Sequence, residues 1–231
     1  MFGEYKIEEF EIGYEDFYAE IKKQKNLYVY VRSFRNEKVE KLIASKDVKV
    51  LVNPVEPVNL PKPITNYLLI EFEKPISIEP REFSTLYVTF PIEVAVLLVS
   101  RDIKILDIFS FVKQKFTLYG DSTNGIICKY WTSKIFEDLP ELDWLKEGLI
   151  ELKIYNESEE WQEMKKAVFN VYDMKIYYDE KVVSSAYVRI LSSKVAETGF
   201  NEISYGKKSI ELYTAKKIPI IKKKFFMEWG L

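Results

Sequence analysis

The chain has 231 residues, enough for one large domain or two small ones, and its 47% hydrophobic content excludes a disordered protein. Its 34 basic and 36 acidic residues give a net charge of −2, so the chain as a whole has no electrostatic attraction to nucleic acids or acidic membranes. No apolar run approaches the roughly 20 residues that cross a bilayer. The charged opening MFGEYKIEEF lacks the apolar core of a secretory signal, and we therefore expect a soluble, cytoplasmic protein.

Two residue counts limit the chemistry. The chain has no histidine and a single cysteine, Cys128, which excludes Ser-His-Asp triads, Cys-His dyads and cysteine-rich or histidine-ligated metal sites. The eight glycines form no GxGxxG fingerprint, so a Rossmann cofactor site is not expected. We expect no cofactor and no dedicated metal site, although carboxylate, lysine and oxygen-ligated Mg²⁺ or Ca²⁺ chemistry stay open.

Most segments alternate with period two, which predicts β-strands. In KNLYVYVRSF (25–34) the alternation places Leu27, Val29 and Val31 on one face and Tyr28, Tyr30 and Arg32 on the other. Turn signals recur at short intervals, which favours a sandwich or a barrel. We expect an all-β protein of antiparallel strands in two packed β-sandwich-like halves, with at most one or two short helices.

The proline-rich segment VNPVEPVNLPKPIT (52–65) predicts an extended path without a helix. It can be read as a ligand for a proline-binding domain or as a stiff connector between sheets. We favour the connector, because Val55, Val58, Leu60 and Ile64 are apolar and suited to burial.

A domain boundary, if the chain has one, is expected within 111–115. It divides an N-terminal half (1–112) from a C-terminal half (113–231), with one continuous domain as the alternative.

The segment KFTLYGDSTNGIICKYW (115–131) has two glycines at the spacing of a phosphate loop. A phosphate loop needs Lys and Ser or Thr after the second glycine, whereas Ile126 and Ile127 follow here, so that interpretation fails. The segment instead predicts a hairpin, in which Asn124 and Gly125 tolerate positive φ and Asp121 bonds the turn backbone.

The same hairpin holds the candidate contact residues. Side chains that combine charge with stacking surface are suited to a partner or ligand: Lys115, Tyr119, Asp121, Lys129 and Trp131. The alternative is cross-strand packing, in which lysine stems cover the rings. Cys128 is expected to be a small buried residue rather than a nucleophile.

Helical signals are few. Residues 133–146 (SKIFEDLPELDWLK) can hold one or two helical turns, limited by Pro140. Residues 158–166 (SEEWQEMKK) can begin a helical turn or form the long loop of a hairpin.

Two acids interrupt apolar segments, Glu93 in FPIEVAVLL and Asp107 in KILDIFSF. They are the weak candidates for catalytic acids, because burial would raise their pKa. The alternative is that each faces outward or pairs with one of the many lysines.

Lysine supplies 29 of the 34 basic residues, a bias that fits a thermophilic source. Several segments resemble a family of archaeal proteins classed as a domain of unknown function: FGEYKI, LPKPITNYLLIEFEKPISIEP, STLYVTFPIEVAV, KFTLYG, GIICKYW, MKIYYD and MEWG. The resemblance covers nearly the whole chain and implies an archaeal origin and one family unit. It implies no activity and no catalytic residue.

The leading functional hypothesis is a binding or protein-interaction module without catalytic activity, whose partner is another protein or a second copy of the chain. The first alternative is a carboxylate-dependent or divalent-metal-dependent hydrolase of glycans or phosphoesters, which needs two acids roughly 5–10 Å apart in one cleft. The second alternative, binding of single-stranded nucleic acid, is disfavoured by the near-neutral charge.

Overall fold

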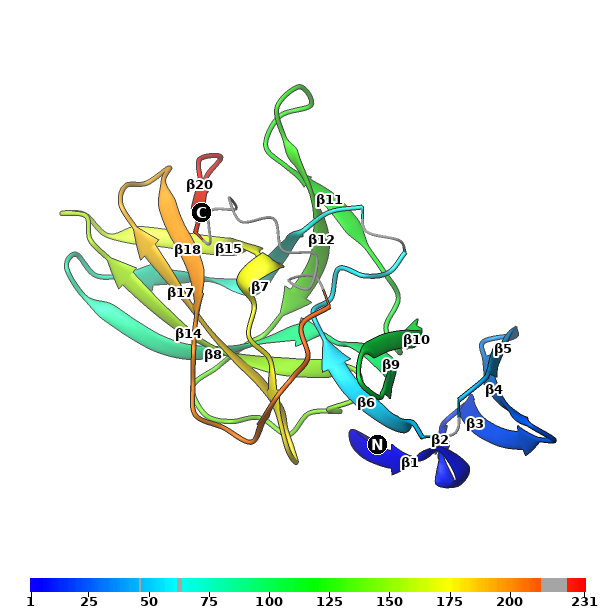
Figure 1. The fold of residues 1–231 in the computed structure, drawn as a ribbon. Coiled ribbons are helices and arrows are strands. Elements are labelled where there is room, and N and C mark those ends of the chain that lie inside the picture. The colour runs from blue at the N-terminus through cyan, green and yellow to red at the C-terminus, as the bar shows by residue number, and fades with distance from the viewer. Residues whose placement is uncertain (46, 62–63, 213–223) are drawn as a thin grey trace. The chain divides into compact units, whose positions relative to one another are not determined.

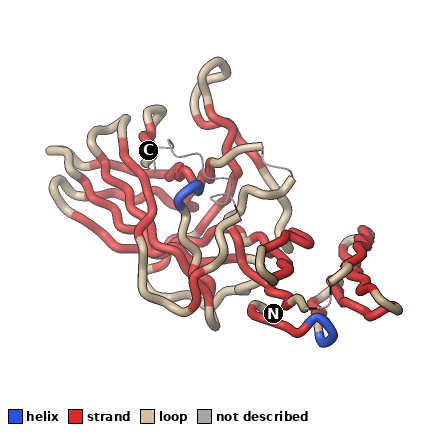
Figure 2. The backbone as a smooth tube through the Cα atoms, in the orientation of Figure 1, coloured by secondary structure: helices blue, strands red, loops and turns tan. Residues whose placement is uncertain are grey.

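The structure is a computed structural model that describes residues 1–45, 47–61, 64–212 and 224–231. It is all-β, with 59% of residues in strands and 3% in helical turns, and several sheets pack together (Figures 1 and 2). The helical turns are two 3-10 turns, η1 (Ile7–Glu9) and η2 (Val171–Asp173). The all-β prediction is confirmed. No helix in the described part of the chain is long and apolar enough to cross a bilayer.

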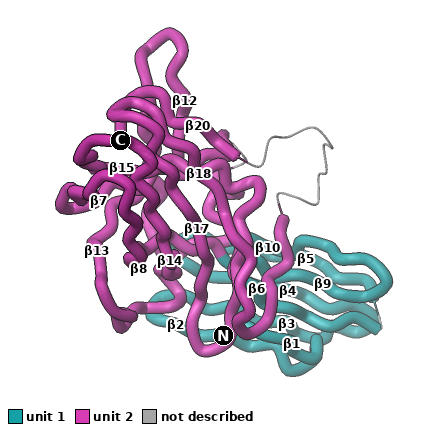
Figure 3. Tube along the Cα trace, turned by 90° about the vertical axis from the view of Figure 1, so that its left-hand side faces the viewer, with its two compact units in different colours: residues 1–53, 94–108 teal, residues 54–93, 109–231 magenta. Residues whose placement is uncertain are grey.

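The chain divides into two compact units, each built from separate stretches of sequence (Figure 3). Unit 1 comprises residues 1–53 and 94–108, and unit 2 comprises residues 54–93 and 109–231. The expected division into the continuous halves 1–112 and 113–231 stays a prediction, as does independent folding of either half.

Unit 1 carries two four-stranded sheets. One follows the order β1 (Gly3–Lys6), β6 (Lys49–Val55), β9 (Glu93–Val99) and β10 (Ile103–Phe109), with a few end residues assigned to unit 2. The other is an antiparallel meander of β2 (Glu11–Tyr14), β3 (Phe17–Gln24), β4 (Leu27–Phe34) and β5 (Glu37–Ile43).

Strand β4 matches the expected alternation, and its buried face is the one that carries polar groups. Tyr28, Tyr30 and Arg32 are buried, whereas Leu27 is exposed. Arg32 lies in the interior because an acidic partner, described below, neutralises it.

Unit 2 carries a four-stranded sheet and an eight-stranded sheet. The first follows the order β11 (Phe116–Tyr119), β12 (Ile126–Ser133), β7 (Tyr67–Ile78) and β15 (Gln162–Asn170). The second follows the order β13 (Ile135–Phe136), β8 (Phe83–Pro91), β14 (Glu147–Asn156), β17 (Val182–Ile190), β16 (Tyr177–Tyr178) and β19 (Lys207–Lys208). In addition, β18 (Ala196–Asn201) pairs with β17 and β20 (Phe225–Met227) pairs with β18.

The two sheets of unit 2 pack on each other. Thr198 Oγ1 donates to the carbonyl of Val168 at 2.6 Å, and the rings of Phe169 and Phe200 lie 5.4 Å apart. Both sheets carry fully buried apolar side chains, as at Phe169, Ile70 and Leu152.

Two strand pairs of unit 2 are parallel, where the sequence predicted antiparallel strands alone. They are β12 with β7 and β14 with β17. A parallel pair needs a long crossover, which is usually a helix. Here β15 lies within the connection from β14 to β17, so a strand of the opposite sheet makes the crossover.

Neither possible helix is present in its described segment. Residues 133–146 hold strand β13 followed by turns. In residues 158–166 a turn leads into β15, and β14 and β15 belong to different sheets, so the hairpin alternative is wrong as well. The Asn156 amide donates to the carbonyls of Ile78, Glu79 and Glu160, and Ser158 Oγ donates to Asn156 Oδ1. These hydrogen bonds satisfy polar groups of the turn, so the segment does not need a helix to pair them.

The proline-rich segment connects β6 to β7, which belong to different sheets, as the connector interpretation predicts. Val55 and Val58 are buried. Ile64 is 52% exposed, so its expected burial is wrong.

Candidate functional site

The predicted hairpin is present and projects from its sheet (Figure 1). Asp121 Oδ1 accepts hydrogen bonds from the backbone N–H groups of Thr123 and Asn124 at 2.7 and 2.8 Å. The positive φ of the turn lies at Gly120 (+109°) and not at Asn124 or Gly125, so that detail of the prediction is wrong. Gly125 is needed for space, because a Cβ there would lie 2.3 Å from the carbonyl oxygen of Asp121.

Tyr119 anchors the hairpin to the C-terminal segment. Its ring packs edge-on against Trp229 at 5.7 Å, and its hydroxyl donates to the carbonyl of Gly230 and accepts from the N–H of Trp229, both at 3.1 Å. Burial raises the pKa of the Tyr119 hydroxyl. The side chain is therefore part of the support of the hairpin rather than of its exposed surface.

Lys129 is buried in an ion pair with Glu93. Its Nζ lies 3.0 Å from Glu93 Oε1 and 3.1 Å from the carbonyl of Leu60, which accepts a further hydrogen bond. Glu93 also accepts from the N–H groups of Asn59 and Leu60 at 2.8 and 3.3 Å. Burial raises the pKa of Glu93 and lowers the pKa of Lys129, while their mutual attraction opposes both shifts.

The remaining hairpin candidates differ in exposure. Trp131 is half-buried and its Nε1 donates to Thr89 Oγ1 at 2.9 Å. Lys115 and Asp121 are exposed. Of the five candidates, only Lys115 and Asp121 therefore offer an exposed side chain, and their role as contacts stays a prediction.

Cys128 is fully buried, as expected, and burial raises the pKa of its thiol to about 12. The thiolate, which is the reactive form, is therefore scarce near neutral pH.

One apolar patch of the hairpin escaped the sequence interpretation. Leu118 lies directly opposite Ile127, and their exposed fractions are 46% and 50%. Phe116, two residues before Leu118, is exposed on the same side of the strand. We call Phe116, Leu118 and Ile127 the hairpin face. The alternation of the sequences FTLY and IIC places these side chains on one side of the hairpin. It does not indicate which side of the hairpin is exposed to solvent.

Asp107, the second candidate acid, is buried within unit 1. Its Oδ2 accepts from Arg32 Nε at 2.6 Å and from the Tyr30 hydroxyl at 2.8 Å. Burial and the Asp107 charge raise the pKa of Tyr30. Each candidate acid is therefore paired with a cation of its own unit: Glu93 with Lys129, as the lysine alternative holds, and Asp107 with Arg32. Among the described residues, no three or more Cys, Asp and Glu side chains are grouped so as to hold a metal ion.

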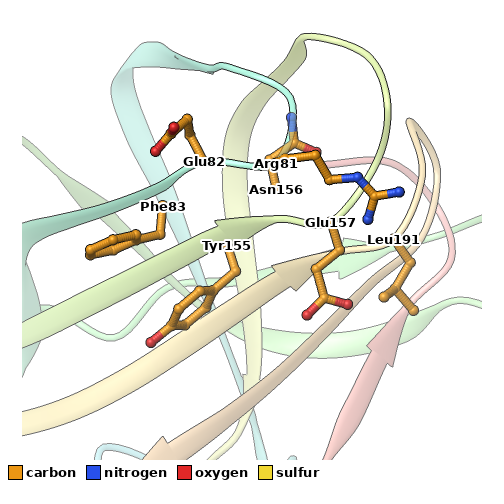
Figure 4. A pocket seen from close by; sticks show the side chains of 7 residues that line it. All are labelled: Arg81, Glu82, Phe83, Tyr155, Asn156, Glu157 and Leu191. Atoms are coloured by element: carbon orange, nitrogen blue, oxygen red, sulfur yellow. The ribbon is translucent and has the colours of Figure 1, made fainter.

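A second exposed site lies on the outer face of the β8–β14–β17 sheet. It is a pocket of about 460 Å³ lined by Arg81, Glu82, Phe83, Tyr155, Asn156, Glu157 and Leu191 (Figure 4). Phe83 and Tyr155 are cross-strand neighbours whose rings stack with centroids 6.1 Å apart and planes 25° apart. We call this site the Phe83–Tyr155 pocket.

A comparison with known protein families gives a match that covers nearly the whole chain. The profile of a family described as a protein of unknown function (DUF432) matches residues 1–228. The chain belongs to the DUF432 family. The comparisons with curated proteins and with solved structures give no match.

Proposed function

We propose that this DUF432 protein is a binding module that acts without catalysis and engages another polypeptide chain through the hairpin face. The observation that carries this proposal is the pair Leu118 and Ile127, two large apolar side chains that lie opposite each other and are both about half exposed. Apolar side chains grouped at the surface favour a protein contact.

The position of β11 supports a polypeptide partner. It is an outer strand of its sheet, and no described strand pairs with its other edge. Proteins normally protect such edges with charged residues. The outer strand β5 follows that rule with Lys38, Glu40 and Lys41, whereas β11 reads Phe-Thr-Leu-Tyr. An unprotected edge can pair with an added strand, whose side chains would then contact the hairpin face.

The support beneath the hairpin is rigid, which reduces the entropy lost on binding. The Lys129–Glu93 pair holds β12 to the proline-rich segment, and Tyr119 holds β11 to the C-terminal segment. The Asp121 hydrogen bonds fix the turn.

The test places a photo-crosslinking amino acid at position 118 and, as a matched control, at Leu42, an exposed leucine on the protected strand β5. We expect one discrete adduct from position 118 in host cells or in purified protein, and its loss when Ile127→Lys is added. An adduct at a multiple of the 27.3 kDa chain identifies a second copy, and any other mass identifies a different protein. No adduct at position 118, or equal adducts at both positions, would refute the proposal.

The two alternative functions gain no support. A hydrolase would use Glu93 and Asp107, and each of them is already paired with a buried cation. A nucleic-acid site on the hairpin would use Lys129, which is buried.

The proposal extends to the source and location. The lysine-rich composition supports a heat-adapted source, and the resemblance of several segments to an archaeal family supports an archaeal origin. A cytoplasmic location is part of the same proposal. A thermal unfolding midpoint in the range of ordinary mesophilic domains, about 45–65 °C, would count against the heat-adapted origin.

A further inference from the structure

The outer face of the second sheet of unit 2 arranges aromatic and charged side chains in a row across four strands. Phe83 on β8 lies opposite Tyr155 on β14, Tyr155 lies beside Arg189 on β17, and Arg189 lies opposite Glu197 on β18. Paired residues of neighbouring strands point to the same side of a sheet. The row therefore forms one surface, and the Phe83–Tyr155 pocket lies at its aromatic end (Figure 4).

The two rings form an exposed flat platform. Phe83 is 66% exposed and Tyr155 is 36% exposed, and their planes are nearly parallel. The face of an aromatic ring carries partial negative charge and attracts weakly positive C–H groups. A flat ligand with C–H bonds on one face would cover this platform.

Beside the pocket, a matched pair of charges joins the lining residue Glu157 to Arg189 on β17. Arg189 donates from Nε and Nη2 to the two carboxylate oxygens of Glu157, at 2.8 and 3.1 Å. Arg189 also lies 3.5 Å from Glu197, and Arg81 forms an ion pair with Glu159. Each arginine at the pocket is thus neutralised by a carboxylate, which disfavours a phosphate or another anion as ligand.

The backbone around the pocket is held in place by one buried side chain. Asn156 is 1% exposed, and its amide donates to the carbonyls of Ile78, Glu79 and Glu160 at 2.8–3.0 Å. Ile78 is the last residue of β7, Glu79 begins the loop to β8, and Glu160 lies in the loop before β15. The pocket therefore needs little reorganisation to bind a ligand.

We propose that the Phe83–Tyr155 pocket binds a neutral sugar chain. The C–H face of one sugar ring stacks on Phe83 and Tyr155, and its hydroxyl groups hydrogen-bond to Glu157, which lines the pocket, and to Arg189, which lies beside Tyr155 on the next strand. A nucleobase can also stack on the rings, but its phosphates would meet arginines that carboxylates already neutralise. This site is separate from the hairpin face, so a sugar-binding activity goes beyond the proposed protein contact.

The test is affinity electrophoresis of the full chain in native gels containing one neutral polysaccharide each, such as a β-glucan, xylan, mannan or starch, followed by titration calorimetry with the matching oligosaccharide. We expect wild-type protein to be retarded by at least one neutral polysaccharide, with little change as salt is raised. We expect Phe83→Ala and Tyr155→Ala each to weaken binding roughly tenfold or more.

The matched control is Phe116→Ala, which removes an exposed phenylalanine from the hairpin face. Phe116→Ala should bind sugar like wild type. The sugar site is therefore tested independently of the hairpin face, and a failure of the hairpin proposal would not count against it. Circular dichroism of each variant shows whether it is folded, and Tyr155→Phe, which keeps the ring, should retain most of the binding. The sugar proposal is overturned if no neutral polysaccharide binds, or if Phe83→Ala and Tyr155→Ala bind as well as Phe116→Ala. It is also overturned if only charged polysaccharides bind and high salt abolishes that binding.

Discussion

Lys129 Nζ lies 3.0 Å from Glu93 Oε1, and both side chains are almost completely shielded from solvent. Backbone groups of the proline-rich segment also take part: the carbonyl of Leu60 accepts from the lysine, and the N–H groups of Asn59 and Leu60 donate to the carboxylate. Such partners allow two charges to stay inside a protein.

Removing one member of this pair should destabilise the fold strongly. We expect Lys129→Met to lower the free energy of unfolding by about 3–5 kcal/mol, because Glu93 is left buried without its cation. The double variant Lys129→Met/Glu93→Leu should cost less than the sum of the two single changes. Urea unfolding of the four proteins measures this coupling, and additive effects would contradict it.

The turn glycine Gly120 should not tolerate a side chain. Its φ is +109°, and an added Cβ would lie 2.9 Å from both Gly125 Cα and Trp229 Cδ2. We expect Gly120→Ala to lower the free energy of unfolding by more than ~1 kcal/mol. Gly13→Ala is the matched control, since a Cβ there meets nothing within 4 Å, and it should be neutral or slightly stabilising. If the two changes lowered the free energy of unfolding equally, the described turn geometry would be contradicted.

The Cys128 thiol should make stability fall at high pH. Burial raises its pKa from 9.0 to about 12. As the pH rises above about 9, the unfolded chain loses this proton first, so the stability present at lower pH is lost on the way to pH 12. The unfolding free energy of wild type minus that of Cys128→Ala should therefore fall as the pH rises from about 9 toward about 12, by at most ~1.4 kcal/mol per pH unit.

Labelling provides an independent check on the same thiol. Ellman's reagent should leave Cys128 unmodified in the folded protein and react fully in urea. Rapid labelling of folded protein near neutral pH would show that the thiol is accessible.

Asp107 should be as important to unit 1 as Glu93 is to unit 2. Asp107→Asn leaves Arg32 buried without its carboxylate, so we expect a loss of about 3–5 kcal/mol. Asp102→Asn is the control on an exposed aspartate of the same segment, and it should change stability by less than about 0.5 kcal/mol. Thermal or urea unfolding compares the two, and a similar small effect of both would contradict the buried pair.

Local sequence signals predicted local structure well. The glycines and Asp121 between two alternating segments located the hairpin, and the isolated acids Glu93 and Asp107 were correctly suspected of being buried. These signals did not show which face of a strand is buried. Lys129 was predicted as a surface contact, yet its partner Glu93 is 36 residues earlier in the chain.

The helix at 158–166 failed for a related reason. Ser158 resembles a helix cap, but its hydroxyl donates to Asn156 instead. The Phe83–Tyr155 pocket was missed because only the register of β8 against β14 brings the two rings together. Pairing across such distances depends on the tertiary fold and leaves no short motif.

The interleaved units constrain how the protein folds as it is made. Strands β7 and β8 leave the ribosome before β9 and β10, which complete unit 1, and long before β12, β14 and β15, their own partners. The apolar side chains of β7 and β8 must therefore stay unpaired, or be held by a chaperone, until β12, β14 and β15 have been synthesised. Unit 1 can close first, at Ile108, but unit 2 can close only after its last strands have been synthesised.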